Sequence, residues 1–193
     1  AEIRSGLPTL QHTIMVPVLG EPVDVARFPR AVDWHALRST QPLSPEPVAA
    51  DHPLWIVYSS GTTGLPKAIG ITQGQLSARI TGFATPFSVD KPPTISMMSV
   101  PFFHVGGAIG VLGNLYAGNT YVVQTRFDAG EWLRIVQENR VTSTFMVPTM
   151  LQRILDHPDF DSTDLSSLAA IAYGAAAAPI ALVRRAMAAL PHV

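Results

Sequence analysis

A short run of glycine and hydroxyl-bearing residues offers the clearest chemistry in the sequence. Residues 59–64 read SSGTTG, and Leu65, Pro66 and Lys67 close the run. Glycine lets the backbone take positive φ and approach an anion closely, so that consecutive amides can form a concave anion site. The hydroxyls add donors, and Lys67 adds a positive charge. The pattern predicts a phosphate-binding loop made by Ser59, Ser60, Gly61, Thr62, Thr63, Gly64 and Lys67.

Two other interpretations of this run have to be weighed. A flexible Ser/Gly linker has the same composition, although this run is short and follows directly on the apolar segment 54–58. A P-loop requires the spacing G-x-x-x-x-G-K-[ST]. Here the two glycines are three residues apart, and Ala68 stands where a P-loop has its metal-binding hydroxyl. The spacing excludes the P-loop and leaves the linker as the alternative.

Two later segments place small or polar residues directly after strand-like runs. His104 lies in the sequence PFFHVGG, which follows the apolar run 95–100. Gly174, Ala175 and Ala176 follow a second apolar run that ends at Tyr173. Ligands gather at the carboxyl ends of strands in α/β sheets, so both segments are candidate site loops. From the residues alone, a hydrogen-bonded loop or core histidine and a plain tight turn are the favoured interpretations of these two segments.

The string YSSGTTGLPKA (residues 58–68) resembles the signature phosphate loop of the adenylate-forming superfamily. This superfamily contains acyl-CoA synthetases, peptide-synthetase adenylation domains and luciferases. The resemblance implies that residues 59–64 and Lys67 hold the triphosphate of ATP while a carboxylate attacks the α-phosphorus. The implied products are an acyl-adenylate and pyrophosphate, after which coenzyme A, the implied co-substrate, receives the acyl group.

The two later segments resemble further elements of the same family. The PFFHVGG segment is similar to the family's P-x-F-H-x-x-G element, which implies that His104 faces the carboxylate and the acyl pocket. Lys67 and His104 are therefore the candidate catalytic residues. The segment after Tyr173 is similar to the turn that packs against adenine, which implies adenine contacts for Gly174, Ala175 and Ala176.

The order of predicted elements indicates an α/β fold with a doubly wound sheet of parallel strands. Expected strands are 13–18, 54–58, 68–71, 95–100, 120–123, 143–147 and 168–173, and expected helices are 32–38, one from 73 onward, 107–116, 128–140, 149–157 and 179–190. With the resemblance, this order predicts part of the large N-terminal domain of an AMP-forming ligase. Residues 1–90 are expected to form a partial first subdomain with the phosphate loop, and 91–193 a βα-repeat subdomain with the acyl pocket and adenine turn.

Composition narrows the classes of function. The 193 residues are 47% hydrophobic and 14% charged, with a net charge of −1 and no cysteine. A near-neutral chain has no general basic face for nucleic acid or anionic membranes. Without cysteine, thiolate zinc sites are excluded. The aspartates at 156, 159, 161 and 164 do not have the spacing of a calcium loop, so we expect no metal site there. No segment has the length of a membrane span, and we expect a cytoplasmic protein.

The resemblance covers only the middle of the family's large domain. The family's Thr-Glu segment, which serves phosphate and Mg²⁺, and its C-terminal domain with a catalytic lysine are absent from the 193 residues. The chain is therefore expected to be a fragment, or a mosaic of two relatives, that is incomplete for catalysis. Its first half resembles acetoacetyl-CoA synthetases, and its second half resembles bacterial fatty-acid–CoA ligases.

The expected function is activation of a carboxylic acid, favoured to be a fatty acid, by ATP and then by coenzyme A. An acetoacetyl-CoA synthetase, a non-catalytic nucleotide-binding or structural fragment, and a peptide-synthetase adenylation domain are the alternatives.

Overall fold

A computed structural model describes residues 13–16, 24–27, 31–37, 44–59, 64–84 and 94–193. The chain forms two compact units, Ala1–Pro47 and Val48–Val193. The predicted subdivision at residue 90 stays a prediction. No helix in these described ranges is long and apolar enough to cross a membrane.

The first unit contains a small parallel strand pair. Strand β1 (Thr13–Met15) pairs with β2 (Ala31–Asp33), and short 3-10 turns occupy Val25–Arg27 (η1) and Trp34–Leu37 (η2). The helix expected at 32–38 is wrong, because 31–33 is strand and only a 3-10 turn follows. The Asp33 carboxylate accepts a hydrogen bond from the backbone N–H of His35 at 2.7 Å. Asp33 thus caps the turn rather than lying inside a helix.

The second unit begins with a β-hairpin and a helix. Strands β3 (Pro53–Ser59) and β4 (Lys67–Thr72) pair antiparallel and confirm the two predicted strands. Helix α2 (Gln73–Ala84) follows at once. Thr72 and Gln75 form a reciprocal pair of backbone-to-side-chain hydrogen bonds at its start, which fixes the point where strand becomes helix. Helix α2 packs against α3 (Val105–Tyr116).

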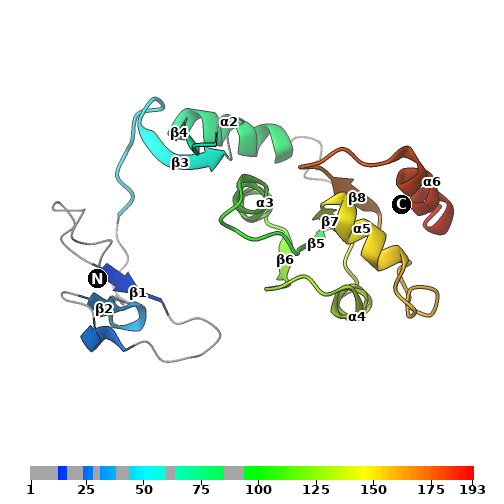
Figure 1. Ribbon diagram of the computed structural model, residues 1–193. Helices are drawn as coiled ribbons and strands as arrows, with labels where there is room; N and C mark the ends of the chain where they lie inside the picture. The colour runs from blue at the N-terminus through cyan, green and yellow to red at the C-terminus, as the bar shows by residue number, and fades with distance from the viewer. Residues whose placement is uncertain (1–12, 17–23, 28–30, 38–43, 60–63, 85–93) are drawn as a thin grey trace. The chain divides into compact units, whose positions relative to one another are not determined.

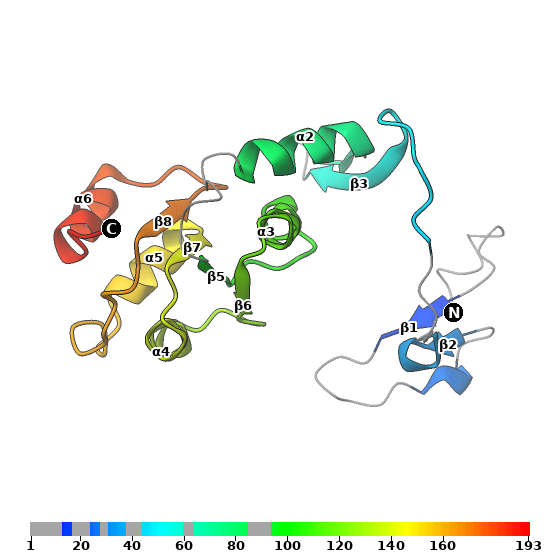
Figure 2. The ribbon, with the colours of Figure 1, turned by 180° about the vertical axis from the view of Figure 1, so that it is seen from behind.

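A four-stranded parallel sheet forms the centre of this unit (Figures 1 and 2). Its strands are β5 (Ile95–Met98), β6 (Thr120–Val123), β7 (Ser143–Met146) and β8 (Ala170–Tyr173), in the spatial order β6-β5-β7-β8. The connection from β5 moves outward to β6, and the next one crosses back to β7. The predicted α/β doubly wound sheet is confirmed, and its topological switch point lies between β5 and β7.

The main core covers one face of this sheet. Helices α4 (Ala129–Asn139), α5 (Pro148–Leu155) and α6 (Ile180–Ala189) supply it. Its centre is fully buried and apolar, with Trp132, Met97, Leu133, Met146, Ile154 and Leu168 as its largest members. Each such side chain contributes about 1.5–3 kcal/mol by leaving water. This face is the scaffold that holds the strands in register.

Helix α3 lies on the opposite side of the strands from α4 and α5 (Figures 1 and 2). It contacts β5 and β6, the two strands that it connects. Since one helix cannot cover four strands, β7 and β8 are less shielded on this side. The residues Phe145 and Ala172, which face this side, are half-buried and exposed respectively.

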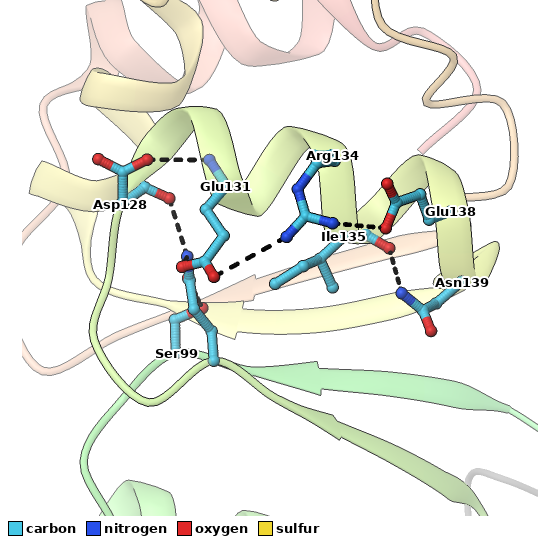
Figure 3. A network of polar contacts seen from close by, with 8 residues as sticks. Ser99, Asp128, Glu131, Arg134, Ile135, Glu138 and Asn139 are labelled. Carbon is cyan, nitrogen blue, oxygen red and sulfur yellow. Dashed lines mark hydrogen bonds and ion pairs between the residues drawn. The ribbon is translucent and has the colours of Figure 1, made fainter. Parts of the chain in front are cut away.

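A polar network ties the carboxyl ends of β5 and β6 to the start of α4 (Figure 3). The Ser99 hydroxyl donates to the side-chain carbonyl of Gln124 at 2.8 Å, and the Gln124 amide donates to the Asp128 carbonyl and the Glu131 carboxylate, each at 2.9 Å. The Asp128 carboxylate caps α4 through the N–H of Glu131. Half of a capping box is therefore present, while the Glu131 carboxylate accepts from Gln124 and is paired with Arg134.

Candidate active site

The predicted phosphate loop lies at the tip of the β3–β4 hairpin. Ser59 and Lys67 are opposite each other as the last residue pair of the antiparallel ladder. Lys67 is exposed, so its ammonium group is accessible to an anion. Gly64 has φ of +87°, a left-handed conformation that strains any residue with a Cβ. The predicted residues Ser60, Gly61, Thr62 and Thr63 lie outside the described residues.

The predicted His104 loop lies after β5, beside the switch point of the sheet. His104 is exposed and directly precedes α3. Its backbone N–H donates to the Pro101 carbonyl at 3.1 Å. The centroids of the His104 and Phe103 rings are 4.7 Å apart. A Cβ at Gly107 would lie 2.9 Å from the Pro101 carbonyl carbon, so only glycine allows this close approach. The loop is thereby folded back on the first turn of α3, and the imidazole stays at the carboxyl edge of the sheet.

The predicted adenine turn begins where β8 ends. The Gly174 N–H donates to the Met146 carbonyl of the neighbouring strand at 3.2 Å. Ala175 has φ of +65°, a conformation rare for a residue with a Cβ. Ala175 and Ala176 are both exposed. Strained backbone of this kind concentrates at functional sites, and it is held here by the ladder on its N-terminal side.

Phe145 lies between the start of α3 and the turn that begins at Gly174. A Cβ at Gly106 would meet one edge of the Phe145 ring at 3.5 Å, and a Cβ at Gly174 would meet the other edge at 3.4 Å. The residues that follow β5 and β8 therefore flank one aromatic ring. Ser59 and Lys67 lie on the separate hairpin, which α2 links to α3.

A cavity of about 430 Å³ lies against α3, on the less shielded face of the sheet. Two rows of side chains across the strands form its floor. One row is Ser96, Ser143 and Ala170, and the row nearer the carboxyl edge is Met98, Phe145 and Ala172. Three glycines of α3, Gly106, Gly110 and Gly113, form the facing wall together with Val105, Ile109 and Ala117.

The lining of this cavity is mainly apolar. The hydroxyls of Ser96 and Ser143 lie 3.0 Å apart and bond each other, which leaves the floor with little unmet polarity. Volumes of about 300–1,000 Å³ with apolar walls are typical of small-molecule sites. The cavity can therefore hold the apolar part of a substrate whose polar end lies at the carboxyl edge.

Sequence reasoning missed most of this cavity. Phe145, Met98 and Gly110 were not singled out as candidate site residues. One signal in the sequence points to Gly110, because the glycines at 106, 110 and 113 recur at helical spacing on one face of α3. Phe145 and Met98 stand beside apolar neighbours in strand-like runs, and no periodicity there shows which side chain faces the core.

Tyr121 adds a buried polar group behind α3. Within the described residues, its hydroxyl oxygen is the one fully buried side-chain nitrogen or oxygen atom without a hydrogen-bond partner. Burial raises the pKa of Tyr121 above its ordinary value, so the hydroxyl keeps its proton.

Two of the four aspartates in the 156–164 segment form ion pairs with arginine. Asp156 pairs with Arg185 and accepts from Gln152, and Asp164 pairs with Arg140 at 2.8 Å. These bonds to Gln152 and Arg185 lower the pKa of Asp156, and bonds from Ser166 and Arg140 lower that of Asp164. Among the residues with described positions, no group of three or more His, Cys, Asp or Glu is placed to hold a metal ion.

Comparisons with known proteins agree with this architecture. The family model of AMP-binding enzymes matches residues 3–193. The chain is 35% identical over 71% of its length to the medium/long-chain-fatty-acid–CoA ligase FadD8 of Mycobacterium tuberculosis, and it covers 24% of that protein. It is 36% identical over 72% of its length to a feruloyl-CoA synthase of an Amycolatopsis species, with 28% of that protein covered.

A solved structure supports the same assignment of the fold. The inhibitor-bound N-terminal domain of FACL13 from Mycobacterium tuberculosis matches with a TM-score of 0.71 at 24% identity, over 82% of this chain and 41% of that one. At this identity the match concerns the fold, and it agrees with the predicted α/β architecture. The chain spans 24% and 28% of the length of the two curated relatives above. It belongs to the family of AMP-binding enzymes.

Proposed function

We propose that this chain is part of an AMP-forming acyl-CoA ligase that activates a carboxylic acid with ATP and transfers the acyl group to coenzyme A. The observation that carries the proposal is the apolar cavity beside the switch point of the sheet, bordered by the segment after His104. An enzyme that joins an acid to AMP needs an apolar site for the acyl group next to a polar edge where the carboxylate meets phosphate. The cavity and the carboxyl edge have this arrangement.

Each predicted site residue has a role in this proposal. Ser59, Lys67 and the loop between them bind the β- and γ-phosphates and stabilise the charge that grows on the departing pyrophosphate. The imidazole of His104 orients the carboxylate at the mouth of the cavity. Gly174, Ala175 and Ala176 allow the flat adenine ring to approach the backbone closely.

The carboxylate oxygen attacks the α-phosphorus, the bond to the bridging oxygen of pyrophosphate breaks, and an acyl-adenylate forms. The sulfur of coenzyme A then attacks the acyl carbon and AMP leaves. No Mg²⁺ ligand is proposed in the described part of the chain, where no group of three or more His, Cys, Asp or Glu is placed to hold a metal ion.

The size of the cavity favours a larger acid over acetoacetate. A volume of about 430 Å³ is far more than an acetoacetyl group fills, and an unfilled apolar cavity contributes no binding energy. The relatives reported above act, by their names, on fatty acids and on ferulate. We therefore propose a fatty or aryl-substituted acid. The resemblance of the first half to acetoacetyl-CoA synthetases stays a prediction.

Calorimetry with ATP tests the phosphate site and the alternative of a purely structural segment. Lys67 is one of two lysines in the chain, and Lys91→Ala supplies a control that removes the same charge elsewhere in the sequence. We expect Lys67→Ala to weaken ATP binding at least about tenfold, because it removes a charge-assisted hydrogen bond to phosphate, while Lys91→Ala binds as the parent does. Equal binding by all three proteins would place the phosphates elsewhere, and no binding by the parent would favour the structural alternative.

A further inference from the structure

Resting on the proposed function, we propose that Met98 and Gly110 form an adjustable wall of the cavity and set the length of the acyl group that it accepts. Both residues line the cavity, one from β5 and the other from α3. They meet where the helix passes over the strand.

The contact between the two residues leaves no space for a side chain at position 110. A Cβ added there would lie well inside contact distance of the Met98 terminal methyl group. It would also lie 3.3 Å from the Tyr121 hydroxyl. The thioether is flexible and is the group that can move. A larger residue at 110 therefore displaces the Met98 methyl group, and because Met98 lines the cavity, this displacement changes the space inside it.

The position of this contact along the cavity decides its effect. The lining residues of α3 and its C-cap run from Val105, at the carboxyl edge of the sheet, to Ala117 near the opposite edge. Gly110 lies near the midpoint of this stretch. A chain that enters beside His104 must pass Met98 to reach the space next to Gly113. A displaced Met98 therefore excludes long acyl groups and still admits short ones.

The occupant is the acyl group rather than another protein segment because of three properties of the cavity. Its floor is apolar and its serine hydroxyls are already paired. Its length follows α3, which suits an extended chain. Its one end lies beside the loop of His104, where the proposed reaction places the carboxylate. A segment of the same protein that fills the cavity instead is an outcome that the experiment below detects.

Acid-dependent ATP–pyrophosphate exchange by the full-length protein tests this proposal, with straight-chain acids from hexanoate to hexadecanoate. We expect Gly110→Ala to lower kcat/KM at least about tenfold for the longest accepted acid relative to the shortest, since one methylene in an apolar pocket is worth about 10- to 200-fold. Met98→Ala is expected to extend the range toward longer acids. The double variant is expected to regain the acids that Gly110→Ala loses, because alanine at 98 leaves room for the new Cβ.

Two glycine-to-alanine controls separate local from general effects. Gly82→Ala changes an exposed position of α2, and a Cβ there meets nothing within 4 Å. Gly113→Ala lines the cavity, but its Cβ also meets nothing within 4 Å. We expect Gly82→Ala to keep the parental chain-length profile and Gly113→Ala to change it less than Gly110→Ala does.

Three results discriminate between the claims. Exchange that persists with the parental chain-length profile in Gly110→Ala and Met98→Ala overturns this inference and leaves the proposed function standing. Loss of stability in these variants without a change of profile means that a protein segment fills the cavity, and it overturns the inference too. If the parent exchanges with no acid, the proposed function itself is wrong. If Gly110→Ala does not fold, Met98→Ala alone decides the chain-length question.

Discussion

The two faces of the four-stranded sheet differ in what their side chains do. On one face, α4, α5 and α6 bury Trp132, Met146 and their neighbours almost completely. On the other, α3 presents glycines to the strands and leaves a cavity. Tight packing is what stability requires, and an unfilled apolar space is tolerated where a ligand binds. The difference indicates that one face is scaffold and the other is site.

The largest expected effect is on the scaffold face. Trp132 is 1% exposed, and Trp132→Ala is expected to lower the free energy of unfolding by about 3–5 kcal/mol because it opens a large cavity. Tyr116→Ala, an aromatic residue of α3 that is 63% exposed, is the matched control, expected within about 0.5 kcal/mol of the parent. Urea unfolding measures both. Similar losses in the two variants would contradict the assignment of faces.

Two neighbouring residues of β7 sharpen the comparison, because they point to opposite faces. Met146 belongs to the core, whereas Phe145 lines the cavity. We expect Met146→Ala to lower the free energy of unfolding by about 2–5 kcal/mol. Phe145→Ala is expected to cost less stability, about 1–2 kcal/mol for a half-buried ring.

The second readout for this pair is KM for the acid in the full-length protein. We expect Phe145→Ala to raise this KM at least about tenfold, because the ring supplies apolar contact in the cavity. Met146→Ala, assayed at a temperature where it is folded, is expected to leave KM unchanged. An equal effect on KM would show that the cavity is not the acyl site.

A smaller effect is expected at the cap of α4, which belongs to the scaffold. The Asp128 carboxylate accepts from the N–H of Glu131 at 2.9 Å. Asp128→Ala should lower the free energy of unfolding by about 1 kcal/mol. Asp161→Ala, an exposed aspartate in the 159–164 turn, is the control and should change it by less than about 0.5 kcal/mol. Equal unfolding midpoints for the two variants would show that the cap does not contribute to the free energy of unfolding.

The smallest effect concerns acid pH. The pKa of Asp164 is lowered in the folded state by bonds from Ser166 and Arg140, so the ionised carboxylate stabilises the fold above the pKa of the unfolded chain. This contribution is lost as pH falls through the folded pKa. Asp164→Asn is therefore expected to be less stable than the parent at neutral pH. The difference should shrink as pH falls below about 3.9, the ordinary aspartate value, and vanish below the lowered folded-state pKa. A stability difference between Asp164→Asn and the parent that stays constant at all pH values would show that ionisation of Asp164 is not its cause.

Local patterns were sufficient to predict most of the α/β unit. The strand at 120–123 has the expected bounds, and 95–98, 143–146 and 170–173 differ only at their ends. Alternating strands and helices with caps such as Asp128 carry this information locally. The helix expected near Trp34 does not form. The Asp33 carboxylate accepts a hydrogen bond from the backbone N–H of His35, and this bond closes a turn directly after the strand. Such a bond is not visible in hydrophobic periodicity.

The candidate site was predictable only in part. Glycine-rich and hydroxyl-rich loops are recognisable from residue type alone. Ser59, Lys67, His104 and Gly174 were therefore expected in the loops at strand ends, and the structure has them in these loops. The cavity proposed to hold the acyl group depends on strand order and on which face α3 covers. Phe145 therefore reads as an ordinary core residue until the sheet is assembled, and the roles of all these residues stay predictions.

Acid-dependent ATP–pyrophosphate exchange by the full-length protein tests the central claim most directly, with parent and Lys67→Ala compared. The claim predicts that labelled pyrophosphate enters ATP only when a suitable carboxylic acid is present, and that Lys67→Ala reduces this rate at least about tenfold. Exchange without added acid, or no exchange with any fatty or aryl acid tested, would contradict it.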